Sequence, residues 1–283
     1  MRLAVNKTYK MYVGGKFIRS ESGRSLSQQG TNYCHGSRKD LRDAIVAARG
    51  AQASWEARTA YNRGQILYRI AEMLEARATE FCDVMCAEKS ATCDQNKEEI
   101  QCAVDRLVYY CGWADKFSSI FGSVNPVAEN YFNFTVPEAT GVVGIVADEG
   151  TALIGLVSQI ASCIVSGNTC VVLASDKYPL TACELGEVLA TSDVPGGVVN
   201  ILTGHKQELI PHMAKHMDVN AIDYRDGDTK TEQLLKNEGA ENVKRIKLSK
   251  RTTRSGWIKD SAQGPYEIEK FVEMKTVWHP VGV

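Results

Sequence analysis

Short apolar runs alternate with helix-forming segments between Gly141 and Leu248, and this alternation constrains the fold more than any other feature of the sequence. Short runs that are apolar throughout are typical of strands buried on both faces of a parallel sheet. The expected strands are 141–146, 169–173, 198–202, 219–224 and 243–248, and the expected intervening helices are 153–165 and 179–192. Strands that alternate with helices predict an α/β fold with a doubly wound, Rossmann-like parallel sheet.

The part of the chain before this alternation is expected to be mostly helical. Residues 12–18 are two short strand-like runs around a glycine pair, which predicts a hairpin. Apolar residues then recur at helical spacing from Asp40 to Trp55, from about Tyr61, and from about Asn96. No glycine or proline interrupts residues 65–90, so the second of these segments could be one long helix or two joined helices.

Two more strands are expected outside the alternation. Residues 131–136 alternate aromatic and polar side chains, as a half-buried strand does. Residues 266–277 alternate enough to form a final strand. Residues 249–263 are rich in Lys, Arg, Ser and Thr, so we expect an exposed linker there.

The charge balance and the apolar runs exclude several kinds of partner. The chain has 33 basic and 34 acidic residues, which give no strong field for nucleic acid or an anionic membrane. The longest apolar stretch, 151–165, is shorter than the roughly 20 residues of a membrane-spanning helix. The nine cysteines are odd in number and irregularly spaced, which favours reduced thiols. We therefore expect a soluble, cytoplasmic protein that binds neither nucleic acid nor membrane.

Motifs that bind phosphate or metal are weak or absent. There is no G-x-G-x-x-G after a strand and no Walker A lysine motif. Gly204 follows the third strand and could let the backbone approach a phosphate, although a strand-ending turn is the simpler interpretation. Glu208, His212 and His216 lie four residues apart, and two histidines at that spacing can bind zinc. No HExxH pattern accompanies them, so a solvated helix face is favoured and no metal site is expected.

An ordered set of short motifs resembles the aldehyde dehydrogenase superfamily. The motifs are Gly141-Val142-Val143-Gly144, Ser166-Gly167-Asn168-Thr169, Pro179-Leu180-Thr181-Ala182, Pro195-Gly196-Gly197-Val198-Val199-Asn200, Thr203-Gly204, His216-Met217-Asp218-Val219 and Asn242-Val243-Lys244-Arg245. Each element alone is weak, but together they cover most of the chain in the order and spacing of the superfamily. The chain is most similar to the second, degenerate domain of aldehyde dehydrogenase family 16.

The positions that carry the chemistry of that family are occupied differently here. The family's Pro-Trp-Asn turn, whose Asn helps hold the oxyanion, corresponds to Asp148-Glu149-Gly150. The general-base Glu corresponds to Ser249, and the Lys that contacts the adenosine ribose corresponds to Leu173. The Gly-Ser-Thr turn near the pyrophosphate corresponds to Asp226-Gly227-Asp228. The family's chemistry needs a thiolate, a base and an oxyanion donor in one cleft, and none of the three is identifiable.

The resemblance implies a division of the chain into parts. Residues 1–248 would form a nucleotide-binding-type domain with an oligomerisation strand near 131–136. Residues 249–265 would be a linker, and residues 266–283 a C-terminal oligomerisation strand. The catalytic domain of the family would be missing.

The function that the resemblance implies is that of a pseudoenzyme. We expect a non-catalytic aldehyde dehydrogenase-like domain that serves assembly, as a homodimer or as a dimer with a related aldehyde dehydrogenase domain. Two alternatives stay open. The chain could be part of an NAD-dependent aldehyde dehydrogenase that takes catalytic residues from a partner domain, or it could be an NAD sensor without turnover.

Only vestigial cofactor contacts are expected. The candidate cofactor-binding residues are Ser175, Asp176 and Gly204, and no catalytic residue is assigned. The two carboxylates of the Asp226-Gly227-Asp228 turn should repel a pyrophosphate unless Arg225 or Lys230 compensates. We therefore expect no cofactor, with NAD binding possible but weak.

Overall fold

The computed structural model describes residues 7–282, and a seven-stranded sheet forms its centre. The strands, in their order across the sheet, are β12 (Arg245–Leu248), β11 (Ala221–Tyr224), β8 (Val142–Val146), β9 (Thr169–Leu173), β10 (Val199–Leu202), β2 (Met11–Val13) and β3 (Lys16–Ile18). The first five are parallel, and β2 and β3 extend the sheet as an antiparallel hairpin. The predicted α/β fold with a doubly wound parallel sheet is confirmed.

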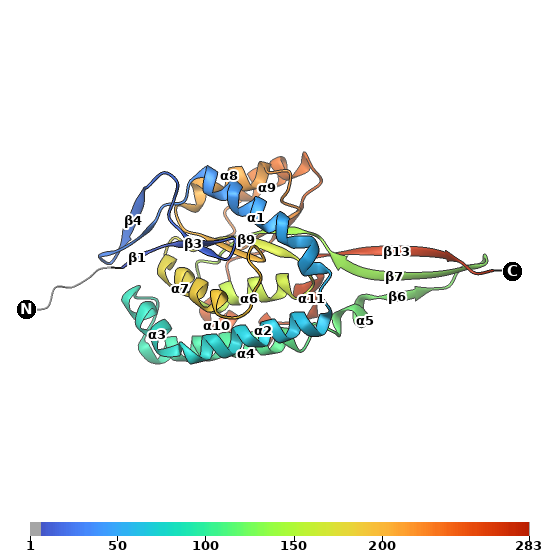
Figure 1. Ribbon diagram of the computed structural model, residues 1–283, viewed down its shortest axis with the longest axis horizontal. Coiled ribbons are helices and arrows are strands. Elements are labelled where there is room, and N and C mark those ends of the chain that lie inside the picture. The colour runs from blue at the N-terminus through green and yellow to red at the C-terminus, as the bar shows by residue number, and fades with distance from the viewer. Residues whose placement is uncertain (1–6, 283) are drawn as a thin grey trace, which may run out of the picture.

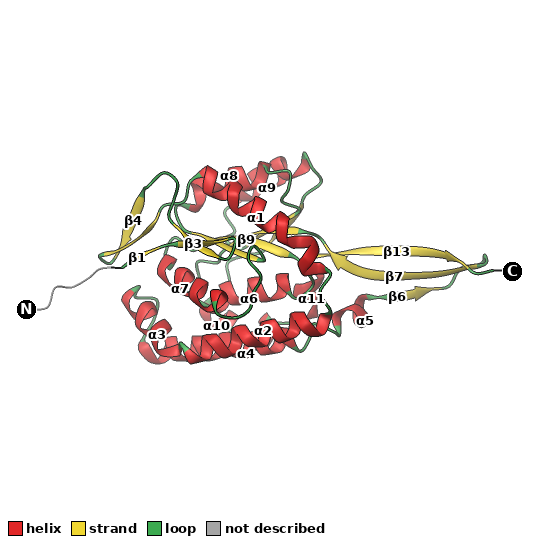
Figure 2. Ribbon diagram, in the orientation of Figure 1, coloured by secondary structure: helices red, strands yellow, loops and turns green. Residues whose placement is uncertain are grey.

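Helices cover both faces of this sheet (Figures 1 and 2). One face carries α1 (Arg38–Glu56), α8 (Lys206–Lys215) and α9 (Thr229–Ala240). The other face carries α6 (Ile154–Ile164) and α7 (Pro179–Ala190), and behind them α2 (Ala60–Ala76), α3 (Ala78–Ala87) and α4 (Cys93–Cys111). The long segment without glycine or proline is two helices, because α2 ends at Ala76 and α3 begins at Ala78, with Arg77 between them.

The core lies in two layers, one on each side of the sheet. Val143 and Ile145 of β8 pack toward α6 and α7, whereas Val142 and Val146 pack toward α1 and α8. Side chains of a strand alternate between its two faces, so a strand with helices on both sides is apolar at every position. This explains the uninterrupted apolar runs of the sequence.

A second, smaller sheet lies near the N-terminus and consists of β1 (Thr8–Tyr9), β5 (Thr31–Cys34) and β4 (Ser25–Gln28). Strand β5 leads directly into α1. A capping box starts that helix: Ser37 accepts a hydrogen bond from the Asp40 N–H, and the Asp40 carboxylate accepts one from the Ser37 N–H.

A third sheet projects from the body as a long arm (Figure 1). It consists of β13 (Val272–Pro280), β7 (Tyr131–Ala139) and β6 (Ser123–Asn125), and α5 (Phe117–Phe121) leads into it. Strands β7 and β13 pair antiparallel over nine residues each. The strand predicted at 131–136 is present and longer than expected. We call these three strands the arm.

Two expectations for the C-terminal part are wrong. The segment expected to be a strand from 266 onward begins instead as the helix α11 (Pro265–Glu269), and the strand starts only at Val272. The segment 249–263, expected to be an exposed linker, contains the helix α10 (Arg254–Trp257) and the 3-10 turn η1 (Asp260–Ala262). Trp257 and Ile268 are buried in the core, which explains why both segments fold onto the body.

Candidate functional site

The strand order reverses between β8 and β11, and ligands of doubly wound sheets bind at the carboxyl ends of the strands at such a point. Five loops meet there, and we call them together the switch-point edge. They are residues 147–153, 174–178, 203–205, 225–228 and 249–253. A cofactor site of the predicted kind would be built from these loops.

A buried ion-pair network connects the loops of the switch-point edge. Lys206, the first residue of α8, is buried and forms ion pairs with Glu149 and, at 3.0 Å, with Asp226. Its ammonium also donates to the Ala147 carbonyl at 3.0 Å. Burial lowers the pKa of Lys206, but the two carboxylates outweigh burial and the net pKa is raised. Lys206 is therefore held charged, and its donors are already engaged.

Glu149 also accepts hydrogen bonds from the loop that follows β9. It accepts hydrogen bonds from the Ser175 hydroxyl at 2.6 Å and the Asp176 N–H at 2.9 Å. Burial raises the pKa of Glu149, but Lys206 and these hydrogen bonds outweigh burial, so the net pKa is lowered. The turn that corresponds to the family's oxyanion-binding turn therefore carries a carboxylate that is already paired with Lys206 and hydrogen-bonded to the chain.

Carboxylates of the chain also cap the helices that begin at this edge. At the N-terminus of α6, Glu99 accepts from the N–H groups of Leu153 and Ile154 at 2.7 and 3.2 Å. At the N-terminus of α7, Glu88 accepts from the N–H groups of Leu180 and Thr181 at 2.7 and 3.1 Å. Both glutamates are buried and come from the α3–α4 region.

The next two helices are capped in the same way. Asp176 accepts from the Lys206 N–H at 3.1 Å at the start of α8, and Asp228 accepts from the Thr231 N–H at 2.9 Å at the start of α9. The hydrogen bonds from Thr231 lower the pKa of Asp228. A helix N-terminus attracts anions because its first N–H groups lack partners within the helix. At this edge, the chain's own carboxylates occupy all four of these N-termini.

The structure brings the three predicted cofactor residues to this edge, where each contacts its own chain. Ser175 hydrogen-bonds Glu149 and accepts from the Lys177 and Tyr178 N–H groups, and Asp176 caps α8. Gly204 has a φ of +140°, and a Cβ there would lie 3.0 Å from the His35 ring. Gly204 therefore lets His35 approach.

Asp226, in the turn after β11, is compensated by residues other than Arg225 and Lys230, the two expected from the sequence, whereas the charge of Lys230 does favour the ionised form of Asp228. Asp226 pairs with Lys206 and, at 3.1 Å, with Arg251. Arg225 turns away from it and pairs with Asp223 and Glu267 at 3.0 and 2.9 Å. Sequence reasoning missed Lys206 because no motif marks it.

Two residues that correspond to functional positions of the family have structural roles in this chain. Leu173 is 1% exposed and belongs to the apolar layer that contains Val146 and Leu202, so its side chain is part of the core. Ser249 is half-buried, and its N–H donates to the Tyr224 carbonyl at 2.9 Å. No side-chain hydrogen bond of Ser249 is formed among the described residues.

Residues 249–263 are fastened against the switch-point edge. Both oxygens of Asp148 accept backbone hydrogen bonds, one from the Gly150 N–H and one from the Thr252 N–H at 3.1 Å. The buried Arg106 donates to the carbonyls of Trp257 and Ala262 at 2.8 and 3.1 Å. Trp257 lies against the first turn of α6, where a Cβ on Gly155 would come within 3.1 Å of the indole nitrogen. This segment therefore covers part of the edge.

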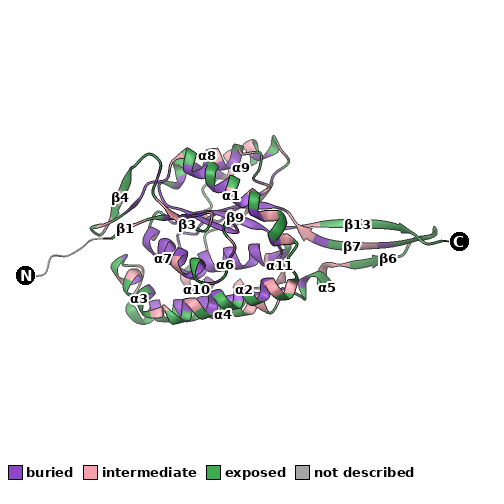
Figure 3. Cartoon of the chain, in the orientation of Figure 1, coloured by how far each residue is buried: buried purple, intermediate pink, exposed green. Residues whose placement is uncertain are grey.

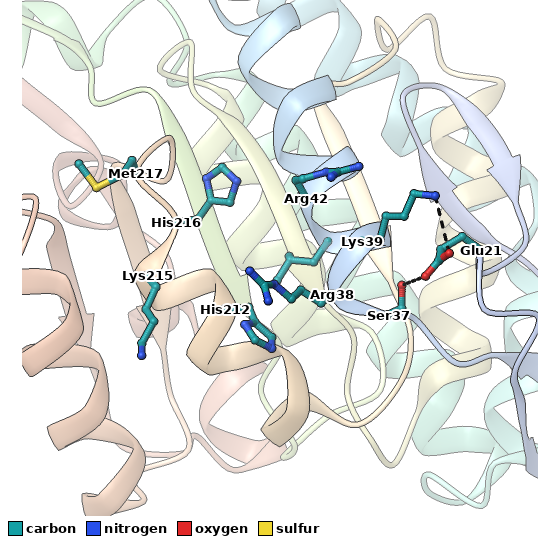
Figure 4. A pocket seen from close by; sticks show the side chains of 10 residues that line it. Glu21, Ser37, Arg38, Lys39, Arg42, His212, Lys215, His216 and Met217 are labelled. Atoms are coloured by element: carbon teal, nitrogen blue, oxygen red, sulfur yellow. Dashed lines mark hydrogen bonds and ion pairs between the residues drawn. The ribbon is translucent and has the colours of Figure 1, made fainter.

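A hollow of about 690 Å³ lies between the first turn of α1 and the last turn of α8 (Figure 4). Basic side chains dominate its lining, which is Glu21, Ser37, Arg38, Lys39, Leu41, Arg42, His212, Lys215, His216 and Met217. The capping box of α1 already engages the Ser37 and Asp40 N–H groups, and Lys39 faces Glu21 at 3.7 Å. None of the lining residues belongs to the switch-point edge.

Comparison with protein families and curated proteins gives consistent matches. The model of the aldehyde dehydrogenase family matches residues 24–276. The mitochondrial and cytosolic 10-formyltetrahydrofolate dehydrogenases of Mus musculus are 26% and 28% identical over 87% of this chain. The chain spans only 28% and 29% of the length of those two relatives.

Solved structures show the same fold. An aldehyde dehydrogenase of Bacillus cereus, solved with NAD+, superposes with a TM-score of 0.80 at 24% identity. The NAD-dependent aldehyde dehydrogenase of Sinorhizobium meliloti gives the same two values. Each match covers 86% of this chain and 50% of the other chain. Among residues 7–282, no helix combines the length and apolar character needed to cross a membrane.

Proposed function

Because this chain belongs to the aldehyde dehydrogenase family, we propose that it is a non-catalytic domain of that family which serves assembly. Its partner is a second copy of the chain, and a related aldehyde dehydrogenase domain is the alternative partner. The observation that carries the proposal is that the chain's own carboxylates occupy the switch-point edge, where they cap four helices and neutralise Lys206.

A dinucleotide does not fit this set of groups. Its pyrophosphate is stabilised by free N–H groups at a helix N-terminus, and an unpaired cation nearby would add to this. Here Glu99 holds the first N–H groups of α6, and Glu149 and Asp226 hold the buried lysine. An incoming pyrophosphate would have to displace carboxylates and then lie beside them, so we propose that NAD binds very weakly.

The chemistry of the family lacks its supports at the same place. An oxyanion is stabilised by hydrogen-bond donors that point at the developing charge. Asp148 and Glu149 offer carboxylate oxygens, and those oxygens already accept hydrogen bonds from the chain. Ser249 stands where the family has a general base, and a serine hydroxyl is a poor base near neutral pH. We therefore propose that the chain does not oxidise aldehydes by itself.

The arm supports the assembly role. Much of the arm is exposed to solvent (Figure 3). Its exposed large apolar side chains include Tyr131, Phe132, Met274, Val277 and Trp278, of which Trp278 is 58% exposed. The outer edge of β13 pairs with no other strand among the described residues, although the strand is nine residues long. A long apolar edge strand is a site for pairing with another chain. Two copies that pair edge to edge in antiparallel fashion satisfy two-fold symmetry, which is why we favour a homodimer.

Sedimentation or light scattering at micromolar concentration tests the assembly proposal. We expect a dimer that Trp278→Asp weakens at least tenfold, because a buried charge replaces an exposed aromatic side chain of the arm. Tyr61→Asp is the matched control, since Tyr61 is 73% exposed on α2, outside the arm, and the dimer should be unchanged. A monomeric wild-type chain that also fails to pair with a complete aldehyde dehydrogenase would refute the proposal.

NADH formation tests the catalytic part of the proposal. The pure chain should form no NADH with NAD and any aldehyde, and adding a complete aldehyde dehydrogenase should give only the activity of that enzyme. Aldehyde-dependent NADH production by the pure chain would overturn the non-catalytic assignment. Activity above that of the added enzyme would favour a domain that shares catalytic residues.

A further inference from the structure

Two histidines and a glutamate from distant parts of the sequence meet beside the switch-point edge. His35 follows β5, His205 immediately precedes α8, and Glu208 lies in the first turn of that helix. One donor atom from each of the three lies within 4.8 Å of the other two. His35 Nε2 is 3.3 Å from Glu208 Oε2, and the two imidazole rings are 5.1 Å apart in an edge-on arrangement.

The local backbone holds His35 against the start of α8. The Thr203 hydroxyl donates to the Cys34 carbonyl at 2.7 Å, and the Gly36 N–H donates to the Thr203 carbonyl at 2.8 Å. A Cβ on Gly36 would lie 2.8 Å from the Thr203 oxygen, and a Cβ on Gly204 would lie 3.0 Å from the His35 ring. Two glycines therefore permit a close approach that any other residue would obstruct.

The side chain of His35 is 8% exposed, and its Nε2 lies within ion-pair distance of Glu208 but forms no hydrogen bond among residues 7–282. A buried polar atom without a hydrogen bond costs about 1–3 kcal/mol, so such an atom in a folded protein calls for an explanation. His205 and Glu208 are exposed, which leaves the open side of the group accessible to an ion and to water.

We propose that His35 Nε2, His205 and Glu208 bind one Zn²⁺ ion, with water as the fourth ligand. Zinc takes imidazole nitrogen and carboxylate oxygen at about 2.0–2.2 Å in a tetrahedral site, which places neighbouring donors about 3.3 Å apart. The His35–Glu208 separation of 3.3 Å matches this value, and the exposed His205 ring can rotate to complete the set.

The bound ion would join β5 to α8. Lys206 lies between two of the ligands in sequence, yet its ammonium points to Glu149 and Asp226. Zinc would therefore fix the first turn of α8, from which Lys206 reaches into the switch-point edge. This assigns the ion a structural role that is independent of any dehydrogenase activity.

Glu208 is the one residue shared with the sequence pattern of Glu208, His212 and His216. In the structure, His212 and His216 line the basic hollow and Glu208 faces His35. Burial lowers the pKa of His212 below the ordinary value of a histidine, and the nearby cations Arg38 and Lys215 lower it in the same direction. The sequence analysis favoured a solvated helix face and no metal site, and the proposed zinc site shares only Glu208 with that helical spacing.

Competition for zinc between the chelator-treated protein and a zinc-sensitive dye tests the site. The experiment uses a Cys86→Ser, Cys93→Ser background, because those two thiols lie 3.0 Å apart and would also bind zinc. We expect one zinc ion per chain, with affinity lowered at least about tenfold by His205→Ala and by Glu208→Gln. Both positions are exposed, so the variants should fold normally.

His212→Ala is the matched control, since it removes a histidine from the same helix. It should leave zinc affinity unchanged, whereas a site built from Glu208, His212 and His216 would lose its zinc. Zinc should also raise the Tm of the parent background but not that of His205→Ala. Failure to bind zinc, or binding that survives both His205→Ala and Glu208→Gln, would overturn the proposal.

Discussion

Replacing Lys206 by methionine tests whether the switch-point edge is held by its own ion pairs. The side chains of Lys206 and Glu149 are 5% and 7% exposed, and that of Asp226 is 14% exposed. Lys206→Met keeps the length of the side chain, removes the cation of the buried Glu149, and leaves the half-buried Asp226 with only the exposed Arg251. Removing one partner of a buried ion pair costs about 3–5 kcal/mol of unfolding free energy.

This loss is large enough to measure by thermal melting and by urea unfolding. An unfolding entropy of about 2.1 cal/mol/K per residue over 283 residues converts 3–5 kcal/mol into a Tm lower by about 5–8 °C. Adding Glu149→Gln to Lys206→Met should restore at least half of the lost stability, because it removes the uncompensated charge.

Arg251→Met is the matched control for this experiment. Arg251 also contacts Asp226 but is 47% exposed, and surface pairs contribute about 0–1 kcal/mol. If Lys206→Met stays within about 1 kcal/mol of the parent protein, or if Glu149→Gln makes it worse, the account of the edge is wrong.

Three further predictions follow from buried groups. Arg106→Met should raise the rate of trypsin cleavage within 249–263 about tenfold or more, because the carbonyls of Trp257 and Ala262 lose a charged donor. Burial is the main cause that raises the pKa of Glu88 from 4.5 to about 7, so the folded state binds its proton more tightly than the unfolded state. Stability from this group is present below pH 4.5 and is lost as pH rises through about 7, by about 3 kcal/mol, and Glu88→Gln should remove this loss in urea titrations. Leu173→Lys should lower the Tm and leave NAD affinity no better, because the lysine would enter the apolar layer.

The sequence predicted the parallel sheet because a strand buried on both faces is apolar at every position. The strands β8, β9 and β10 coincide closely with the predicted runs. The helix α9 was not predicted, because its sequence is polar and only Thr231, Leu235 and Gly239 are buried. The C-terminal segment was misjudged because a single buried tryptophan outweighs the polar composition around it.

The candidate site was harder to predict because its partners are far apart in the sequence. Ser175 and Asp176 could be placed by their position after a strand, but nothing local links them to Glu149 or Lys206. Glu99 caps the first turn of α6 from α4, although it lies 54 residues before Leu153 and 55 residues before Ile154 in the sequence. Periodicity identifies which face of a helix is buried, but it does not show which buried carboxylate caps which helix.

The proposed function depends on the chain's own groups taking the place of a cofactor at the switch-point edge. Calorimetric titration of NAD into the protein measures whether they do, with a complete aldehyde dehydrogenase as the positive control. We expect no saturable binding up to millimolar NAD. A dissociation constant in the low micromolar range would contradict it, because the carboxylates at the four helix N-termini would then have to give way to a pyrophosphate.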